Sequence, residues 1–195
     1  VKTLSKYFSE KSFILKNGIE IESKDIKKNF NKKKIIDLLY FGRIHPKKGI
    51  IDLINMFKII KKKNKFNINL KIVGPKTENK KYLISKIKEY ELGDYITFND
   101  PVYEINDKIN LFNRSKYFIL PSYDEADSMA LKEALSYGVP IIITKDCKFE
   151  DPEEFNIGYT IEHDHNKIYE KIKIIFEKEI NYNEMSNKCN EFAKN

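Results

Sequence analysis

Short apolar runs alternate with longer segments of helical periodicity along most of this chain, and this alternation constrains the fold more than any other feature. The apolar runs are rich in Ile, Leu, Val, Phe and Tyr, as is typical of strands that are buried on both faces of a sheet. The segments between them repeat apolar residues at helical spacing. We predict strands over 35–41, 69–73, 95–98, 117–120, 139–144 and 158–161, and helices over 47–63, 78–91, 104–113, 165–178 and 182–193 and after Ser128.

Strands separated by helices predict an α/β fold, a Rossmann-like parallel sheet with helices on both faces. Ligands of such sheets bind beyond the carboxyl ends of the strands, near the point where the strand order reverses. The loops expected at that edge are 42–49, 74–78, 100–104, 121–128 and 145–150. Function is therefore to be sought among these loops.

The composition narrows the function classes. The 195 residues suffice for one sizeable domain, and no apolar run approaches the length of about 20 residues that a membrane-spanning helix needs. The net charge of +7 would suit nucleic acid, but the lysines are spread along the chain among many Asn and Ile residues. We expect no nucleic-acid partner, although a lysine-rich nucleic-acid binder stays as a minor alternative. Cys147 and Cys189 lack the spacing of metal ligands, which predicts free thiols.

The segment 42–49 combines glycine with cationic side chains. Gly42 ends a predicted strand, Arg43 and Lys48 follow five positions apart, and a helix is predicted to begin near Lys48. Helix N-termini attract anions, and an arginine fork with a lysine charge could hold a diphosphate. A Walker loop is excluded because its GKS/T ending is missing. On charge alone, an ordinary strand–helix turn with solvated lysines is the favoured alternative.

The segment 121–140 places Glu125 in a loop and Glu133 inside the helix that follows. Ser128 is a predicted N-cap, which leaves the N–H groups of Met129 and Ala130 to meet an anion. Glu133 lies off the apolar helix face, where a carboxylate can accept two hydroxyls of a ribose. Glu125 would then face the group attached to the phosphates. For a lone glutamate, a solvated surface carboxylate is the alternative.

Together these motifs resemble those of family-four glycosyltransferases (glycosyl transferases group 1). Glu125 and Glu133, with seven residues between them, look like that family's E-x7-E signature, and 42–49 looks like its G-R-…-K-G element. The segment 16–20, Lys-Asn-Gly-Ile-Glu, is similar to the N-G-I-D start of its C-terminal domain. The shorter motifs Val73-Gly74, Phe98–Val102 and Leu120-Pro121-Ser122 fall in the expected order, so the resemblance covers roughly residues 13–175.

The resemblance implies the donor-binding half of a GT-B enzyme. Residues 1–12 would be an interdomain linker remnant and 13–195 a nucleotide-sugar-binding Rossmann-like domain. The enzyme would transfer a sugar, of hexosyl type, from a nucleotide-diphosphate sugar to a glycan or lipid-linked acceptor, with retention and without metal or cofactor. Its N-terminal acceptor domain is missing here, so the isolated chain is expected to be inactive. Without the apolar centre of a signal peptide, we expect a cytoplasmic protein and leave peripheral membrane contact of the full-length protein open.

The resemblance also implies residue roles. It assigns the donor diphosphate to Gly42, Arg43, Lys48, Met129 and Ala130, the ribose to Glu133, the transferred sugar to Glu125 as the catalytic residue with Asp127 and Ser128, and the base to Val102 and Tyr103. The family has Gly-Phe-Gly after the first glutamate, whereas this chain has Ala126-Asp127-Ser128. A non-catalytic nucleotide-sugar-binding module of the same fold is therefore the alternative.

Some remaining residues receive structural interpretations. His163 and His165 are predicted to lie in a solvated loop, with a metal site as the lesser alternative. His45 is predicted to lie in a turn, with contact to the donor as the lesser alternative. Cys147 follows a strand at the ligand edge, and only as the lesser alternative does it line the pocket. The aromatic residues predicted to lie in the core are Tyr82, Tyr90, Phe57 and Phe118.

Overall fold

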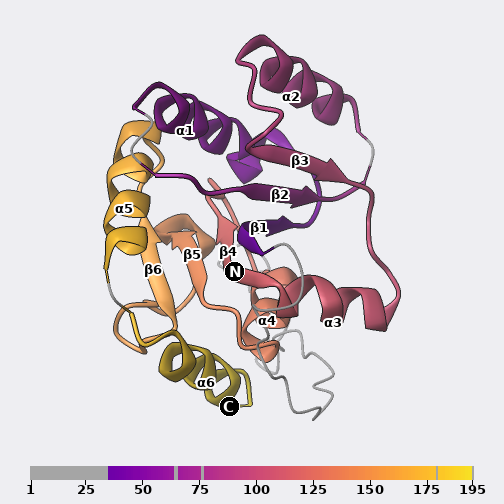
Figure 1. The fold of residues 1–195 in the computed structure, drawn as a ribbon. Coiled ribbons are helices and arrows are strands. Elements are labelled where there is room, and N and C mark those ends of the chain that lie inside the picture. The colour runs from indigo at the N-terminus through magenta and orange to yellow at the C-terminus, as the bar shows by residue number, and fades with distance from the viewer. Residues whose placement is uncertain (1–34, 64–65, 76, 179, 195) are drawn as a thin grey trace, which may run out of the picture.

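A six-stranded parallel sheet organises the residues that the computed structural model describes, 35–63, 66–75, 77–178 and 180–194 (Figure 1). Its order is β3-β2-β1-β4-β5-β6, so the order reverses between the central strands β1 and β4. The strands are β1 (Ile36–Phe41), β2 (Leu70–Val73), β3 (Ile96–Asn99), β4 (Ser115–Leu120), β5 (Ile141–Thr144) and β6 (Gly158–Ile161). The helices are α1 (Ile50–Lys63), α2 (Glu78–Glu89), α3 (Ile105–Asn113), α4 (Met129–Ser136), α5 (His165–Glu177) and α6 (Tyr182–Ala193).

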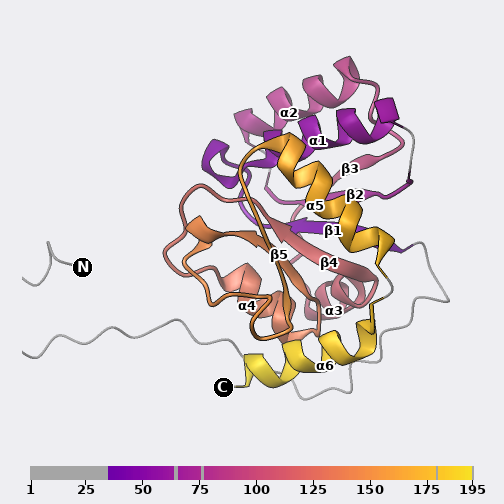
Figure 2. The same ribbon diagram turned by 90° about the vertical axis from the view of Figure 1, so that its left-hand side faces the viewer.

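Helices cover both faces of the sheet. Helices α1, α2 and α5 lie on one face and α3, α4 and α6 on the other (Figures 1 and 2). A sheet covered in this way needs apolar side chains on both faces of its strands, and every residue of β5 is buried. The predicted fold class, a Rossmann-like parallel sheet with helices on both faces, is confirmed.

The first helix begins later than its apolar periodicity predicts. Residues Pro46–Lys48 form a separate 3-10 turn, η1, whose N-cap His45 accepts a hydrogen bond from the Lys47 N–H. Gly49 follows with φ 68°, a left-handed conformation that ends this turn before α1 starts at Ile50. Lys48 therefore lies in η1 rather than in the first turn of a helix, which corrects the prediction. His45 lies in a turn, as predicted.

The loops after β1 and β4 are locked together at the point where the strand order reverses. The Ser122 hydroxyl and the Tyr123 N–H both donate to the Lys47 carbonyl, at 3.1 and 2.7 Å. A Cβ on Gly49 would approach the Pro121 carbonyl oxygen to 2.0 Å. Only glycine allows this approach, so Gly49 fixes how the two loops that carry the predicted site residues lie against each other.

The core predictions hold except at one residue. Phe57 and Phe118 are fully buried and Tyr90 packs partly buried against the core. Tyr82 is 52% exposed and is not a core residue, which corrects the prediction: its helix α2 lies over the outer strands and buries only one narrow stripe. Both cysteines are buried thiols, and neither forms a disulfide.

Two further points concern membrane-spanning helices and the predicted segments near the N-terminus. None of the helices in the described ranges has both the length and the apolar character needed to cross a membrane. The segment 16–20 and the predicted boundary between 1–12 and 13–195 lie outside the described residues.

Candidate functional site

The site is built first on an ion pair between the two loops at the centre of the sheet. Lys48 Nζ, from the loop after β1, pairs with Glu125 Oε1, from the loop after β4. Their side chains are only 15% and 10% exposed, so solvent screens this pair far less than a surface pair. The Glu125 N–H also donates to the Asp146 carbonyl at 3.1 Å, which fixes the backbone of the loop. The structure therefore brings together Lys48 and Glu125, two of the predicted site residues.

Arg43 lies in the same loop as Lys48 and is an exposed residue. Its carbonyl accepts a hydrogen bond from the Tyr40 hydroxyl at 2.7 Å, which ties the turn to the end of β1. Burial raises the pKa of Tyr40, and the negative charge of Glu125 raises it further while the positive charge of Arg43 lowers it. Arg43 forms no ion pair with another described residue. The Tyr40 phenol near the end of β1 is therefore neutral and feels the charges of both Arg43 and Glu125.

The second glutamate is held by a lysine that the sequence did not single out. Lys108 Nζ, from α3, lies 2.8 Å from Glu133 Oε1, from α4, and the side chains are 22% and 25% exposed. The same ammonium lies 5.7 Å from the centre of the Phe41 ring, at the last residue of β1. Glu133 therefore lies within side-chain reach of the strand end that leads to Arg43, on the face covered by α3 and α4. Lys108 falls inside a predicted helix among ordinary charged residues, and no sequence signal marked it.

The N-terminus of α4 begins where the sequence predicts, but its N-cap differs from the prediction. Helix α4 begins at Met129, and the N–H groups of its first turn have no acceptor within the helix. Ser128 occupies the N-cap position with an extended backbone, at φ −85° and ψ 106°, but its side chain makes no capping hydrogen bond. Ser128 therefore occupies the predicted N-cap position, but its hydroxyl does not form the capping hydrogen bond. Met129 and Ala130 are the first two residues of α4 and carry two of these N–H groups.

The loop that replaces Gly-Phe-Gly does not need glycine. The described non-glycine residues with positive φ are Glu91, Lys148 and Asn156, so no residue of the 126–128 segment requires the left-handed region. The Asp127 carboxylate pairs with Lys132 Nζ at 2.7 Å, and its charge is therefore compensated from α4. A carboxylate near a diphosphate would be unfavourable without such a partner.

The loop predicted to meet the base lies at the end of β3, ahead of α3. Tyr103 is 81% exposed there, whereas Val102 is half-buried and packs against the core. Since α3 starts directly after this loop and carries Lys108, the loop and Glu133 are joined through one helix. The structure thus brings the predicted base, ribose and diphosphate residues to the same edge of the sheet.

A cluster of aromatic and acidic residues supports the Glu125 loop from the other side. The rings of Tyr123 and His163 stack with centres 3.9 Å apart, and His163 Nε2 lies 2.6 Å from Asp146 Oδ2. The Tyr123 hydroxyl donates to Asp52 at 2.9 Å, and burial together with this carboxylate raises the pKa of Tyr123 to about 12. His163 therefore lies in a loop, as predicted, but its side chain is only 28% exposed and is held by these contacts, whereas His165 is the first residue of α5. The parallel order β4-β5-β6 carries the three loops to one edge, which sequence spacing does not reveal.

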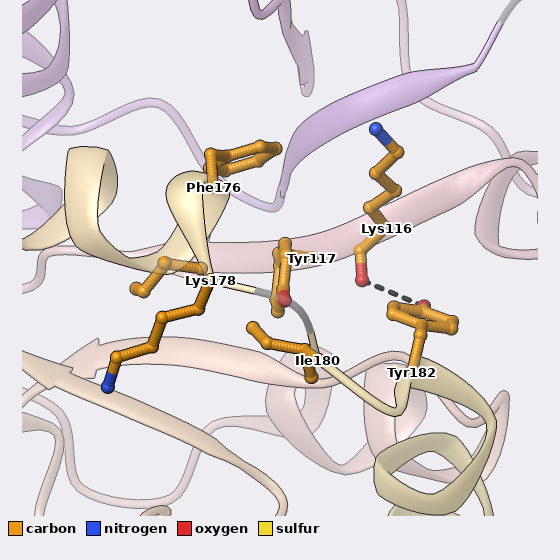
Figure 3. A pocket seen from close by; sticks show the side chains of 7 residues that line it. Lys116, Tyr117, Phe176, Lys178, Ile180 and Tyr182 are labelled. Atoms are coloured by element: carbon orange, nitrogen blue, oxygen red, sulfur yellow. Dashed lines mark hydrogen bonds between the residues drawn. The ribbon is translucent and has the colours of Figure 1, made fainter.

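Two other features do not form part of the candidate site. Cys147 is buried, its thiol donates to the Leu120 carbonyl at 3.4 Å, and burial raises its pKa, so it does not line an open pocket. A hollow of about 300 Å³ lies at the opposite, amino-terminal edge of the sheet (Figure 3). There the Tyr182 hydroxyl donates to the Lys116 carbonyl, and the Lys116 ammonium turns away to Asp37 at 2.7 Å. The hollow lies far from the loops at the carboxyl ends of the strands, and the polar side chains among its lining residues are two lysines and two tyrosines.

Comparison with known proteins gives one family and one fold. Residues 21–195 match the family described as Glycosyl transferases group 1. The capsular polysaccharide biosynthesis glycosyltransferase CapH of Staphylococcus aureus is 32% identical over 144 residues, which cover 73% of this chain and 39% of CapH. The chain spans between 34% and 39% of the length of the curated relatives it matches.

The solved structures show which part of such a protein this chain resembles. The C-terminal domain of the group 1 family protein LpcC from Francisella tularensis superposes with a TM-score of 0.67 and 20% identity, over 85% of this chain and 89% of that domain. Anabaena HepE in complex with UDP superposes with a TM-score of 0.68 and 16% identity, over 83% of this chain and 44% of HepE. The fold is therefore that of one half, the C-terminal half, of a GT-B glycosyltransferase.

Proposed function

Because the chain belongs to the glycosyl transferases group 1 family, we propose that it is the donor-binding domain of a retaining glycosyltransferase. The whole protein would transfer a sugar, of hexosyl type, from a nucleotide-diphosphate sugar to a glycan or lipid-linked acceptor, without a metal. The observation that carries this proposal is the convergence of two ion pairs, Lys48–Glu125 and Lys108–Glu133, at the carboxyl ends of β1 and β4. The UDP bound to HepE supports a nucleotide donor, and the part of CapH in capsular polysaccharide biosynthesis supports a glycan product.

The residue roles follow from where charge develops in the reaction. As the sugar leaves the donor, positive charge grows on the sugar ring and negative charge grows on the departing diphosphate. Arg43, Lys48 and the first-turn N–H groups of α4 would stabilise the diphosphate, as an oxyanion hole does. Removing one such group costs on the order of 100-fold or more in rate.

The two glutamates have separate roles in this proposal. Glu133 would accept the ribose hydroxyls, because an ionised carboxylate has lone pairs left beside the one that faces Lys108. Glu125 would face the transferred sugar, with Asp127 and Ser128 beside it, and Val102 and Tyr103 would meet the base. The charge of Asp127 is balanced by Lys132, which supports a loop that tolerates a diphosphate nearby.

The first prediction concerns binding by this chain. UDP, GDP, ADP and their sugar forms are screened by calorimetry and thermal unfolding, and one nucleotide family is expected to bind. A ligand at 100 times its dissociation constant adds about 2.7 kcal/mol to the free energy of unfolding. The variants Arg43→Ala and Glu133→Ala should lose most of this stabilisation, because each removes a charged contact of the ligand.

The control variants are Lys47→Ala and Glu154→Ala, which remove exposed charges outside the proposed contacts. Equal losses in these controls, or no nucleotide binding by the unmodified chain, would exclude a donor site here. Nucleotide binding without sugar transfer by a full-length protein containing this domain would instead favour the non-catalytic binding module.

A further inference from the structure

Lys108 stands out because it joins three elements at the candidate ribose site. Its ammonium lies 2.8 Å from Glu133 Oε1 on α4 and 5.7 Å from the centre of the Phe41 ring at the end of β1. Its own helix α3 follows the loop proposed to meet the base. Helices α3 and α4 lie side by side on one face of the sheet (Figures 1 and 2).

The ion pair leaves one side of the Glu133 carboxylate open. Lys108 contacts Oε1, while Oε2 accepts no hydrogen bond from another described residue. A carboxylate oxygen can accept two hydrogen bonds, so Oε2 remains available for two adjacent hydroxyl groups. The lysine therefore fixes the direction of the carboxylate without filling it.

We infer that Lys108 is a specificity-determining positioning residue that holds Glu133 so that the site selects ribonucleoside diphosphates by their 2′- and 3′-hydroxyls. The inference rests on the proposed function and names the residue that sets sugar recognition within the nucleotide. A partly buried carboxylate that loses its cation is left uncompensated and turns toward water. Its oxygen would then no longer lie where the ribose hydroxyls meet it.

This role differs from that of a general cation for the diphosphate. A cation that acted only on the phosphates would strengthen the binding of ribonucleotides and deoxyribonucleotides by the same factor. A residue that orients Glu133 changes the ratio of the two affinities, because only the ribose form offers hydroxyls to the carboxylate. The ratio is therefore the quantity to measure.

The experiment compares UDP, GDP and ADP with their 2′,3′-dideoxy forms by calorimetry on the unmodified chain, Lys108→Met and Lys108→Arg. Hydrogen bonds to a charged group predict that the unmodified chain prefers the ribose form by about tenfold or more. Lys108→Met should reduce this preference to about threefold or less, with most of the loss in the ribose form. Lys108→Arg keeps the charge and should restore most of the preference.

The matched control is Lys116→Met, which breaks the partly buried pair with Asp37 at the opposite edge of the sheet and should leave the preference unchanged. In Glu133→Ala, the further change Lys108→Met should have no effect on the ratio, because the positioned group is already gone.

An equal loss of affinity for ribose and dideoxy forms in Lys108→Met, or an unchanged ratio, would overturn the inference and leave the donor site standing. Absence of binding of all six probes to the unmodified chain would overturn both. If Lys108→Met unfolds, failure of the folded Lys108→Arg variant to keep the preference would overturn the positioning role.

Discussion

At the residue scale, Lys48 and Glu125 are tied to each other as well as to their proposed ligand groups. The same ammonium that would hold the diphosphate pairs with the carboxylate that would face the sugar. Both side chains are largely buried, so the pair interacts more strongly than the exposed pair of Lys47 with Asp124. In the proposed function, a bound diphosphate would therefore compete with Glu125 for the charge of Lys48.

Replacing Glu125 with Gln tests this competition. The change removes one negative charge close to the proposed diphosphate and frees Lys48, so the affinity for the nucleoside diphosphate should rise by about threefold to tenfold. Sugar transfer by a full-length protein should fall at least about 100-fold, because the group that faces the sugar is lost. Calorimetry and transfer assays measure the two effects.

Asp124→Asn is the control for charge alone, since Asp124 is exposed and pairs with Lys47 and Lys148. It should change the affinity by less than about twofold at moderate salt. A weaker binding of the diphosphate to Glu125→Gln would show that Glu125 organises Lys48 instead of competing for it.

At the scale of elements, the site depends on how loops from distant parts of the chain are fastened together. The loop after β4 is held on one side by the Lys47 carbonyl and on the other by the stack of Tyr123 on His163. Asp146 links these supports, because its carboxylate meets His163 and its carbonyl accepts the Glu125 N–H. The position of Glu125 is thus set by strands β1, β4, β5 and β6 together.

Gly49→Ala is the sharpest test of this fastening. A methyl group would meet the Pro121 carbonyl oxygen, and φ 68° is unfavourable for alanine, so the free energy of unfolding should fall by at least about 2 kcal/mol. Nucleotide affinity should fall as well, because the loops that carry Lys48 and Glu125 must separate. Urea unfolding and calorimetry measure both.

Gly93→Ala serves as the control, since a Cβ there meets no atom within 4 Å and the backbone is not in the left-handed region. It should change stability by less than about 0.5 kcal/mol. Similar losses in the two variants would mean that the contact between Gly49 and Pro121 carries no structural role.

At the scale of the whole molecule, the core contains tyrosines that must remain uncharged. Burial raises the pKa values of Tyr40, Tyr117 and Tyr182 above the ordinary tyrosine value. The neighbouring Tyr159 raises the pKa of Tyr117 further. In the unfolded chain these phenols lose their protons near pH 10. The unfolded state therefore binds fewer protons above that pH than the folded state does.

We expect the free energy of unfolding to fall as pH rises above about 10. A phenol whose pKa is higher in the folded state than in the unfolded state stabilises the fold below its unfolded-state pKa, and this contribution is lost as pH rises toward its folded-state pKa. Urea unfolding between about pH 8 and about pH 12 measures the slope. Tyr117→Phe should flatten it, whereas Tyr103→Phe, at an exposed site, should not. An identical slope in both variants would assign the alkaline loss to other groups.

The sequence was sufficient for the features that depend on local pattern. Alternating apolar runs and helical spacing predicted the strands, the helices and the two-sided cover of the sheet. The ordered motifs, the E-x7-E and G-R-…-K-G elements among them, predicted the family to which the chain belongs. Periodicity reports which side chains face the sheet, and this property belongs to each segment by itself.

Only the tertiary structure decided which charged groups meet. Lys48 pairs with Glu125 across 77 positions and Lys108 with Glu133 across 25, and the late start of α1 and the exposure of Tyr82 also depend on neighbouring elements. The physical reason is that a parallel sheet brings the ends of non-consecutive strands together, and the order β3-β2-β1-β4-β5-β6 fixes those neighbours. No spacing within a single segment encodes a partner that the strand order supplies.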